Sequence, residues 1–229
     1  MSELVRYSTI DEGMKREFLL LQGKGCAWRK CTFCDYYLDS SSDPFVINEP
    51  VLDMVSGKYS VLDIINSGSA MELDERTLEK IAVTVREKKI SDLWFEAHWM
   101  YRHSLAGFAE QFDCRVHYRI GVETFNPDLR LKWKKGIGRD VTAEEIRRYF
   151  DGICLLAGVK GQTLEDIKTS VETAERLFDY YSVNLFCPNS SQEERDDELA
   201  DAFIREIVPS LRKSRKAEIL IDNTDLGVG

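Results

Sequence analysis

Short apolar runs alternate with amphipathic segments along this chain, and this alternation limits the fold more than any other feature. Apolar runs typical of buried strands occupy residues 16–22, 60–66, 92–98, 115–123, 152–158 and 182–187. Helix-like segments with apolar residues at a 3.6-residue spacing occupy 73–88, 105–111, 143–149, 164–178 and 197–213. Near-continuous apolar strands that alternate with helices predict βαβ units and a parallel sheet. A seventh strand is expected at 217–221.

The number of units predicts a partial barrel. Six or seven βα units are fewer than the eight of a full barrel, and 229 residues fall short of its usual length. A doubly wound open sheet has the same alternation and stays an alternative. Small and polar residues recur where the strands end, and barrels place their ligand-binding residues there. We therefore expect an α/β fold, a partial (β/α)6-type barrel with a short C-terminal strand and tail, and a single domain over residues 1–229.

Composition narrows the class of substrate and the compartment. The chain has 31 basic and 40 acidic residues and a net charge of −9, whereas a protein that grips RNA or DNA usually carries a basic surface. The short basic stretches 132–135 and 212–216 are expected to be solvated helical faces. No apolar run approaches the ~20 residues of a membrane span, and the N-terminus has no secretory apolar region. We expect a cytoplasmic, reduced protein that acts on a small molecule, with nucleic acid and membrane disfavoured.

Three cysteines lie close together directly after the first predicted strand. Cys26, Cys31 and Cys34 have Cys-x4-Cys-x2-Cys spacing. A 4Fe–4S cluster normally takes four thiolates, so three local ligands would leave one iron open to bind and activate another molecule. A plant-type 2Fe–2S site would need a fourth cysteine nearby, but the next is Cys114. A zinc site would need a fourth Cys or His, and the first histidine is His98. Disulfides are disfavoured by the absence of a signal peptide.

Candidate ligand-binding residues follow strand after strand. A glutamate at the end of a buried strand needs a partner or a ligand, and small residues let a backbone approach a ligand closely. The candidates lie at the end of a predicted strand or directly after it: Ser67, Gly68 and Ser69 at the second strand, Glu96 and His98 at the third, Glu123 at the fourth, Val159 at the fifth, Asn184 and Phe186 at the sixth, and Asp222, Asn223 and Asp225 in the tail. The remaining cysteines, Cys114, Cys154 and Cys187, are expected to be isolated and buried.

Four of these features, in order, resemble the radical S-adenosylmethionine (radical SAM) superfamily. They are the cysteine loop that ends in Cys-Thr-Phe-Cys, the Ser67-Gly68-Ser69 turn, the Gly121-Val122-Glu123-Thr124 segment and the Gly158-Val159-Lys160-Gly161 segment. The last two are similar to motifs of the branch that contains tRNA methylthiotransferases and the elongator catalytic subunit. The resemblance runs from residue 26 to about 189. One departure is the first cysteine spacing, which is four residues here and usually three in the superfamily.

The resemblance implies a cofactor pair and a role for each motif. Cys26, Cys31 and Cys34, in a cluster loop at 23–37, would hold a 4Fe–4S cluster whose fourth iron binds SAM. Reductive cleavage of SAM would give methionine and a 5′-deoxyadenosyl radical. Ser67, Gly68 and Ser69 would meet the SAM amino group, Glu123 would bind the ribose or amino-acid part, and Phe33 and the Val159 backbone would flank the adenine. An electron donor such as flavodoxin or ferredoxin is also implied.

The substrate implied by the resemblance is a free base. Relatives that act on tRNA usually carry an added RNA-binding region, and this acidic chain resembles the small radical SAM enzymes that cut queuine to 7-aminomethyl-7-deazaguanine. Glu96, Asp222 or Asp225 would read the base edge, and Asn184, Asn223 or His98 the cyclopentenediol, while Phe186 would stack on the base. Part of this site would be a capping tail at about 214–229. A radical SAM enzyme acting on tRNA is the first alternative, and a non-catalytic iron–sulfur or zinc protein the second.

Overall fold

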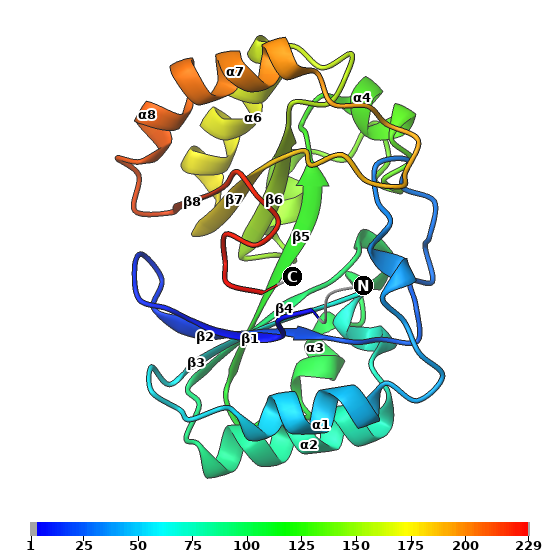
Figure 1. Cartoon of the computed structure of the whole chain (residues 1–229), viewed down its shortest axis with the longest axis vertical. Helices are drawn as coiled ribbons and strands as arrows, with labels where there is room; N and C mark the ends of the chain where they lie inside the picture. The colour runs from blue at the N-terminus through cyan, green and yellow to red at the C-terminus, as the bar shows by residue number, and fades with distance from the viewer. Residues whose placement is uncertain (1–3, 229) are drawn as a thin grey trace. The chain divides into compact units, whose positions relative to one another are not determined.

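A computed structural model describes residues 4–228 of the chain, which group into two compact units (Figure 1). The first unit contains residues 4–29, 36–118 and 224–228, and the second contains residues 30–35 and 119–223. Strand β5, Arg115–Glu123, begins in the first unit and ends in the second. In the described part of the chain, no helix combines the length and apolarity needed to cross a membrane.

The first unit is built on strands that follow one another in sequence order. They are β1 (Tyr7–Ile10), β2 (Arg16–Leu21), β3 (Val61–Asn66) and β4 (Asp92–Glu96). β1 pairs antiparallel with β2, whereas β2, β3 and β4 pair in parallel. Their apolar residues, such as Leu19, Leu62 and Ile64, have no exposed surface, as expected for strands of a parallel sheet that is covered on both faces.

Helices cover the strands of the first unit, and three short turns of 3-10 helix shape the ends of its loops. The α-helices are α1 (Phe45–Asp53), α2 (Glu75–Glu87) and α3 (Leu105–Ala109), and the 3-10 helices are η1 (Tyr36–Leu38), η2 (Ala70–Glu72) and η3 (Trp99–Tyr101). Figure 1 shows α1 and α2 side by side on one face of this sheet. Asp74 begins α2 because its carboxylate accepts a hydrogen bond from the Thr77 backbone N–H.

The second unit continues the alternation. Its strands after β5 are β6 (Gly152–Ala157), β7 (Tyr180–Leu185) and β8 (Ala217–Leu220), all paired in parallel. Its helices are α4 (Pro127–Lys132), α5 (Ala143–Arg147), α6 (Leu164–Leu177), α7 (Asp197–Glu206) and α8 (Val208–Leu211). Thr163 and Asp166 form the capping box that begins α6.

The predicted strands all form, and most differ from the observed ones by one or two residues at an end. The predicted strand 182–187 is displaced, because β7 begins at Tyr180, whose ring is buried, and ends before Pro188. The predicted helix 197–213 is wrong as one element. It divides into α7 and α8 between Glu206 and Val208, since Pro209 has no N–H and its ring excludes a continuous helix.

Candidate cluster and cofactor site

The three cysteines of the cluster loop form no disulfide, and all are half-buried. Cys26 belongs to the first unit, and Cys31 and Cys34 belong to the second. The Arg29 N–H donates to Cys26 Sγ over 3.4 Å, and the Cys34 N–H donates to the Cys31 carbonyl over 3.5 Å. Residues 4–228 bring no three Cys, His, Asp or Glu side chains together closely enough to hold a metal ion. The assignment of these thiols as ligands therefore depends on their spacing and their chemistry.

In the first unit, the turn after β3 lies directly against the start of the cluster loop. Ser67 Oγ accepts the Gly23 N–H over 3.0 Å, and Ser69 Oγ accepts the His98 N–H over 3.0 Å. A Cβ at Gly68 would overlap Glu72 Oε2 and would lie 3.0 Å from the Gly25 carbonyl oxygen. Only glycine fits there without a shift of the backbone, as the close approach of two loops requires. Both serine hydroxyls accept hydrogen bonds from backbone N–H groups of neighbouring loops, which tie the turn to those loops.

Glu72 connects these loops, and sequence reasoning missed it. Its Oε1 accepts the Ala27 N–H over 3.2 Å and the Tyr101 hydroxyl over 2.9 Å, while its Oε2 accepts the Ser69 N–H over 3.0 Å. Burial, followed by the hydrogen bond to Glu72, raises the pKa of Tyr101 to about 12, so this hydroxyl stays a donor at neutral pH. The capping-box spacing of Ser69 and Glu72 was the available signal.

We expect Glu72→Ala to lower the free energy of unfolding by roughly 2 kcal/mol, because three donors lose a charged acceptor. Urea unfolding of the iron-free chain would measure this loss. Glu79→Ala, an exposed position on α2, is the matched control and should change stability by less than about 0.5 kcal/mol. Equal stability of the two variants would show that the Glu72 contacts contribute nothing net.

In the second unit, Glu123 is buried and paired with Lys135. Their side chains lie 2.8 Å apart, from Lys135 Nζ to Glu123 Oε1, and the two residues are only 8% and 7% exposed. β5 carries an irregularity between Gly121 and Glu123, and Glu123 has a φ of 67°, in the left-handed region. A Cβ at Gly121 would lie 2.7 Å from Lys135 Nζ, so glycine makes room for this pair.

The burial of Lys135 corrects one sequence-based interpretation. Residues 132–135 were expected to be a solvated helical face, but α4 ends at Lys132, and both Trp133 and Lys135 are buried. Lys135 Nζ lies 5.5 Å from the centre of the Phe33 ring, which also meets Trp133 edge-on at 6.0 Å. A buried ammonium therefore stands between the predicted SAM ligand Glu123 and the predicted adenine neighbour Phe33.

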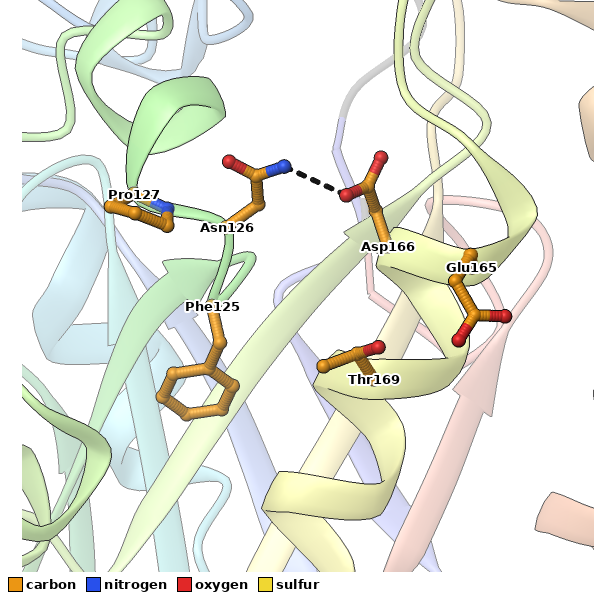
Figure 2. Close-up of a pocket in the computed structure, with 6 residues that line it drawn as sticks. All are labelled: Phe125, Asn126, Pro127, Glu165, Asp166 and Thr169. Atoms are coloured by element: carbon orange, nitrogen blue, oxygen red, sulfur yellow. Dashed lines mark hydrogen bonds between the residues drawn. The ribbon is translucent and has the colours of Figure 1, made fainter.

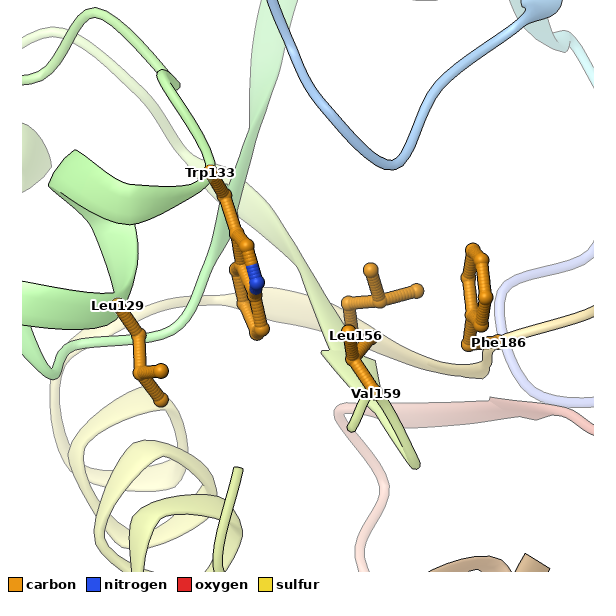
Figure 3. Close-up of a cluster of buried hydrophobic side chains, with 5 residues drawn as sticks. All are labelled: Leu129, Trp133, Leu156, Val159 and Phe186. Carbon is orange, nitrogen blue, oxygen red and sulfur yellow. The ribbon is translucent and has the colours of Figure 1, made fainter. Parts of the chain in front are cut away.

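Three residues predicted to contact SAM or substrate share one apolar cluster. Figure 3 shows its buried members, which come from α4, β6 and the segments that follow α4, β6 and β7: Leu129, Trp133, Leu156, Val159 and Phe186. Phe33, which is partly buried, packs against this cluster. Phe33, Val159 and Phe186 are thus brought together within the second unit. Phe186 is only 3% exposed, so packing accounts for most of its surface.

The other predicted substrate residues are divided between the units. Glu96, His98 and Asp225 belong to the first, and the His98 ring stacks on Trp28 with 4.9 Å between centroids. The second holds Asn184, Asp222 and Asn223. Asn184 Oδ1 is buried without a hydrogen-bond partner among the described residues. In the tail, Asp222, Asn223 and Asp225 are exposed. Within each unit, these side chains stay candidates for substrate contacts.

The remaining cysteines differ from expectation in their burial. Cys114, Cys154 and Cys187 were expected to be buried, but all three are half-buried. Burial, followed by the negative charges of Asp92 and Asp113, raises the pKa of the Cys114 thiol to about 11. A thiol that holds its proton so firmly is a poor nucleophile and a poor ligand.

A surface pocket of about 310 Å³ lies elsewhere in the second unit, between the first turns of α4 and α6. Phe125, Asn126, Pro127, Glu165, Asp166 and Thr169 line it (Figure 2). Asn126 Nδ2 donates to Asp166 Oδ1 over 2.7 Å, and both side chains also cap helices. Burial alone would raise the pKa of Asp166, but hydrogen bonds from Thr163 and Asn126 lower it. The helix caps account for these polar groups, and the pocket contains no predicted site residue.

The residues present fit an iron–sulfur cluster and SAM. Three unbridged thiols at close spacing are the soft donors that iron–sulfur clusters take. Gly68 leaves the backbone of its turn free of a side chain, and Asn66 Oδ1 beside it is buried without a partner among the described residues. Such an orphaned acceptor is the kind of group that a ligand amine satisfies.

Comparison with known proteins gives a strong likeness to a solved structure. No protein-family model and no curated protein matches the chain. A solved structure of queuine lyase from Clostridium spiroforme bound to SAM and queuine is 39% identical, covers 99% of this chain and 100% of its own, and superposes with a TM-score of 0.94. This match confirms the predicted fold class, an α/β partial barrel of the radical SAM kind.

Two more distant structures show the fold alone. A methylornithine synthase is 16% identical, with 88% of this chain and 63% of its own covered at a TM-score of 0.61. Streptococcus suis SuiB is 13% identical, with 90% and 50% covered at a TM-score of 0.55. Both are longer than this chain, which spans the whole length of the first structure but only part of these two.

Proposed function

Because this chain belongs to the queuine lyase family of radical SAM enzymes, we propose that it cleaves SAM reductively and lyses queuine to 7-aminomethyl-7-deazaguanine. The observation that carries the proposal is the 39% identity over 99% of the chain to a structure that holds both SAM and queuine. The cysteine spacing and the acidic charge agree with it, since the first supports a cluster and the second disfavours a tRNA substrate.

The proposed cofactor site takes its residues from the motifs. Cys26, Cys31 and Cys34 would hold a 4Fe–4S cluster as thiolates. When bound, the cluster and SAM would supply the radical chemistry needed to remove a hydrogen atom from the substrate. The SAM amino group would bind to the backbone of the Ser67–Ser69 turn. Glu72 would hold this turn in place by accepting the Ser69 N–H. Glu123 would accept hydrogen bonds from SAM hydroxyls, while the hydrogen bond from Lys135 Nζ holds its carboxylate in position.

The apolar cluster is proposed to provide the surface on which the adenine of SAM and the substrate base pack. Phe33 and Val159 would flank the adenine, and Phe186 would contact the substrate base through its exposed edge. The orphaned Asn184 Oδ1 would accept a hydroxyl of the cyclopentenediol. Glu96, His98, Asp222, Asn223 and Asp225 are proposed contacts of the substrate. The tail at about 214–229 would cap it as part of one domain.

Activity of this kind needs a supply of single electrons. An electron carrier such as flavodoxin or ferredoxin is proposed as the donor. The reducing cytoplasm is proposed as the compartment, because iron–sulfur clusters and thiols are damaged by oxidants.

The test is a product assay on anaerobically reconstituted protein with dithionite, SAM and queuine. We expect 5′-deoxyadenosine and 7-aminomethyl-7-deazaguanine to appear together, as measured by mass spectrometry. Omission of queuine should leave only slow, uncoupled SAM cleavage. Turnover of a tRNA in place of queuine would reject the substrate and retain the radical chemistry, and absence of SAM cleavage with every substrate would support a non-catalytic iron–sulfur or zinc protein.

A further inference from the structure

The segment between β7 and α7 contacts the half of the cluster loop that carries Cys31 and Cys34. We call residues 189–196 the β7–α7 connection; Figure 1 shows the course of the chain between β7 and α7. The Thr32 hydroxyl, between the two cysteines, donates to Glu193 Oε1 over 2.5 Å. The Gln192 N–H donates to the Thr32 carbonyl over 3.0 Å. Both the backbone and the side chain of Thr32, which is 8% exposed, are thus held by this connection.

The C-terminal part of the Cys31–Asp35 stretch is held in the same way. Asn189 Nδ2 donates to the Phe33 carbonyl over 3.0 Å. The Ser190 N–H and hydroxyl both donate to Asp35 Oδ2, over 2.9 and 2.8 Å. Together with Thr32, these residues bracket Cys34 on both sides. This stretch forms no helix or strand, so its polar backbone groups depend on such partners for order.

The same connection also holds the loop after β6. The Lys160 N–H donates to the Glu194 carbonyl over 2.8 Å, and the Asp196 N–H donates to the Gly158 carbonyl over 2.8 Å. Val159 and Arg195 form an antiparallel bridge between these hydrogen bonds. Val159 is fully buried in the cluster against which Phe33 packs. One segment therefore fixes both the cysteine stretch and the residue proposed to flank the adenine of SAM.

We propose that the β7–α7 connection is a positioning element that fixes the Cys31–Cys34 stretch for cluster binding, with Glu193 and Asn189 as its principal positioning residues. The proposal rests on the proposed function, because it concerns the same cluster. The thiol motif in the sequence ends at Cys34, and the connection begins more than 150 residues later. It adds to that motif the contacts that limit how far the two thiols can move. Thr32 and Glu193 form its central contact, which single substitutions can remove from either side.

The test compares two neighbouring glutamates. Glu193→Ala removes the acceptor of the Thr32 hydroxyl, whereas Glu194→Ala removes an exposed carboxylate that pairs with Lys160 Nζ over 2.6 Å. On iron-free protein, we expect hydrogen exchange at the Gln192 amide to be about 10-fold faster in Glu193→Ala than in Glu194→Ala. On reconstituted protein, release of iron to a ferrous chelator should be faster by a similar factor in Glu193→Ala.

Three further variants separate positioning from general destabilisation. Thr32→Val should reproduce the effect of Glu193→Ala, and the double variant should be no worse than either single one, since both remove one contact. Glu193→Gln keeps an acceptor oxygen and should restore slow iron release. Equal iron release from Glu193→Ala and wild type would overturn the proposal, as would an equal effect of Glu194→Ala. If the wild-type protein bound no iron, the proposed function itself would be overturned. If the wild-type protein bound iron and Glu193→Ala released it no faster, only the present inference would be overturned.

Discussion

Cys34→Ala is expected to reduce formation of 5′-deoxyadenosine from SAM to background. Wild-type protein reconstituted anaerobically should hold about four irons and four sulfides per chain, as a cubane cluster does. Removing one of three thiolates leaves a cluster with two protein ligands, which cannot be retained in a form that binds SAM at one open iron. Iron and sulfide analysis and chromatography of the nucleoside product measure the two losses independently. The same result is expected for Cys26→Ala and Cys31→Ala.

Cys154→Ala is the matched control for the cysteine variants. Cys154 lies on β6 and is half-buried like the proposed ligands, so its replacement removes a thiol of similar exposure from outside the motif. Iron content and SAM cleavage should stay at wild-type levels. If Cys34→Ala still formed 5′-deoxyadenosine, the ligand assignment would be wrong, and loss of iron in Cys154→Ala would place a ligand outside the motif.

The sequence predicted the strands well for a physical reason. A strand buried on both faces is a near-continuous apolar run, and the runs that become β2 to β7 are strong local signals. Elements without such a signal were missed. β1 has four residues and is partly exposed, α1 contains Pro50, and α4 follows β5 after only a short connection. A single residue that interrupts a helix, such as Pro209, changes where the helices begin and end. It does not change the alternation of strands and helices along the chain.

The site was predictable where chemistry is carried by local spacing and not where it depends on contacts between distant segments. The cysteine motif and Glu123 belong to local patterns. Lys135 does not, because residues 133–137 alternate between buried and exposed after α4 has ended, and a helical interpretation places Lys135 in solvent. The contact of Glu193 with Thr32 joins residues 161 positions apart, which no local pattern reports.

The pair of Glu123 and Lys135 is where stability and SAM binding are expected to be coupled. Both side chains are almost fully buried, and Lys135 Nζ lies 2.8 Å from Glu123 Oε1. A buried ion pair contributes little more to stability than a well-packed apolar pair of similar size. Removal of one partner, however, leaves an uncompensated buried charge and is strongly destabilising. Glu123→Ala therefore changes two properties at once, since it removes the proposed SAM acceptor and also takes this carboxylate from Lys135.

Lys135→Met is expected to lower the free energy of unfolding of the iron-free chain by about 3–5 kcal/mol, because Glu123 stays buried without its cation. Urea unfolding monitored by circular dichroism would measure it. Lys134→Met, at the neighbouring exposed position, is the control and should change stability by less than about 0.5 kcal/mol.

The double variant Glu123→Gln with Lys135→Met separates the two roles. It removes both charges, so most of the lost stability should return. SAM affinity should not return, because the charged acceptor is gone; one charge-assisted hydrogen bond corresponds to roughly 1.5–3 kcal/mol, or about 10- to 150-fold in Kd. Equilibrium binding of SAM to the reconstituted double variant measures this. Wild-type affinity in a stable double variant would make Glu123 and Lys135 a purely structural pair, and a double variant as unstable as Lys135→Met would mean that packing by the lysine stem, rather than its charge, stabilises this part of the protein.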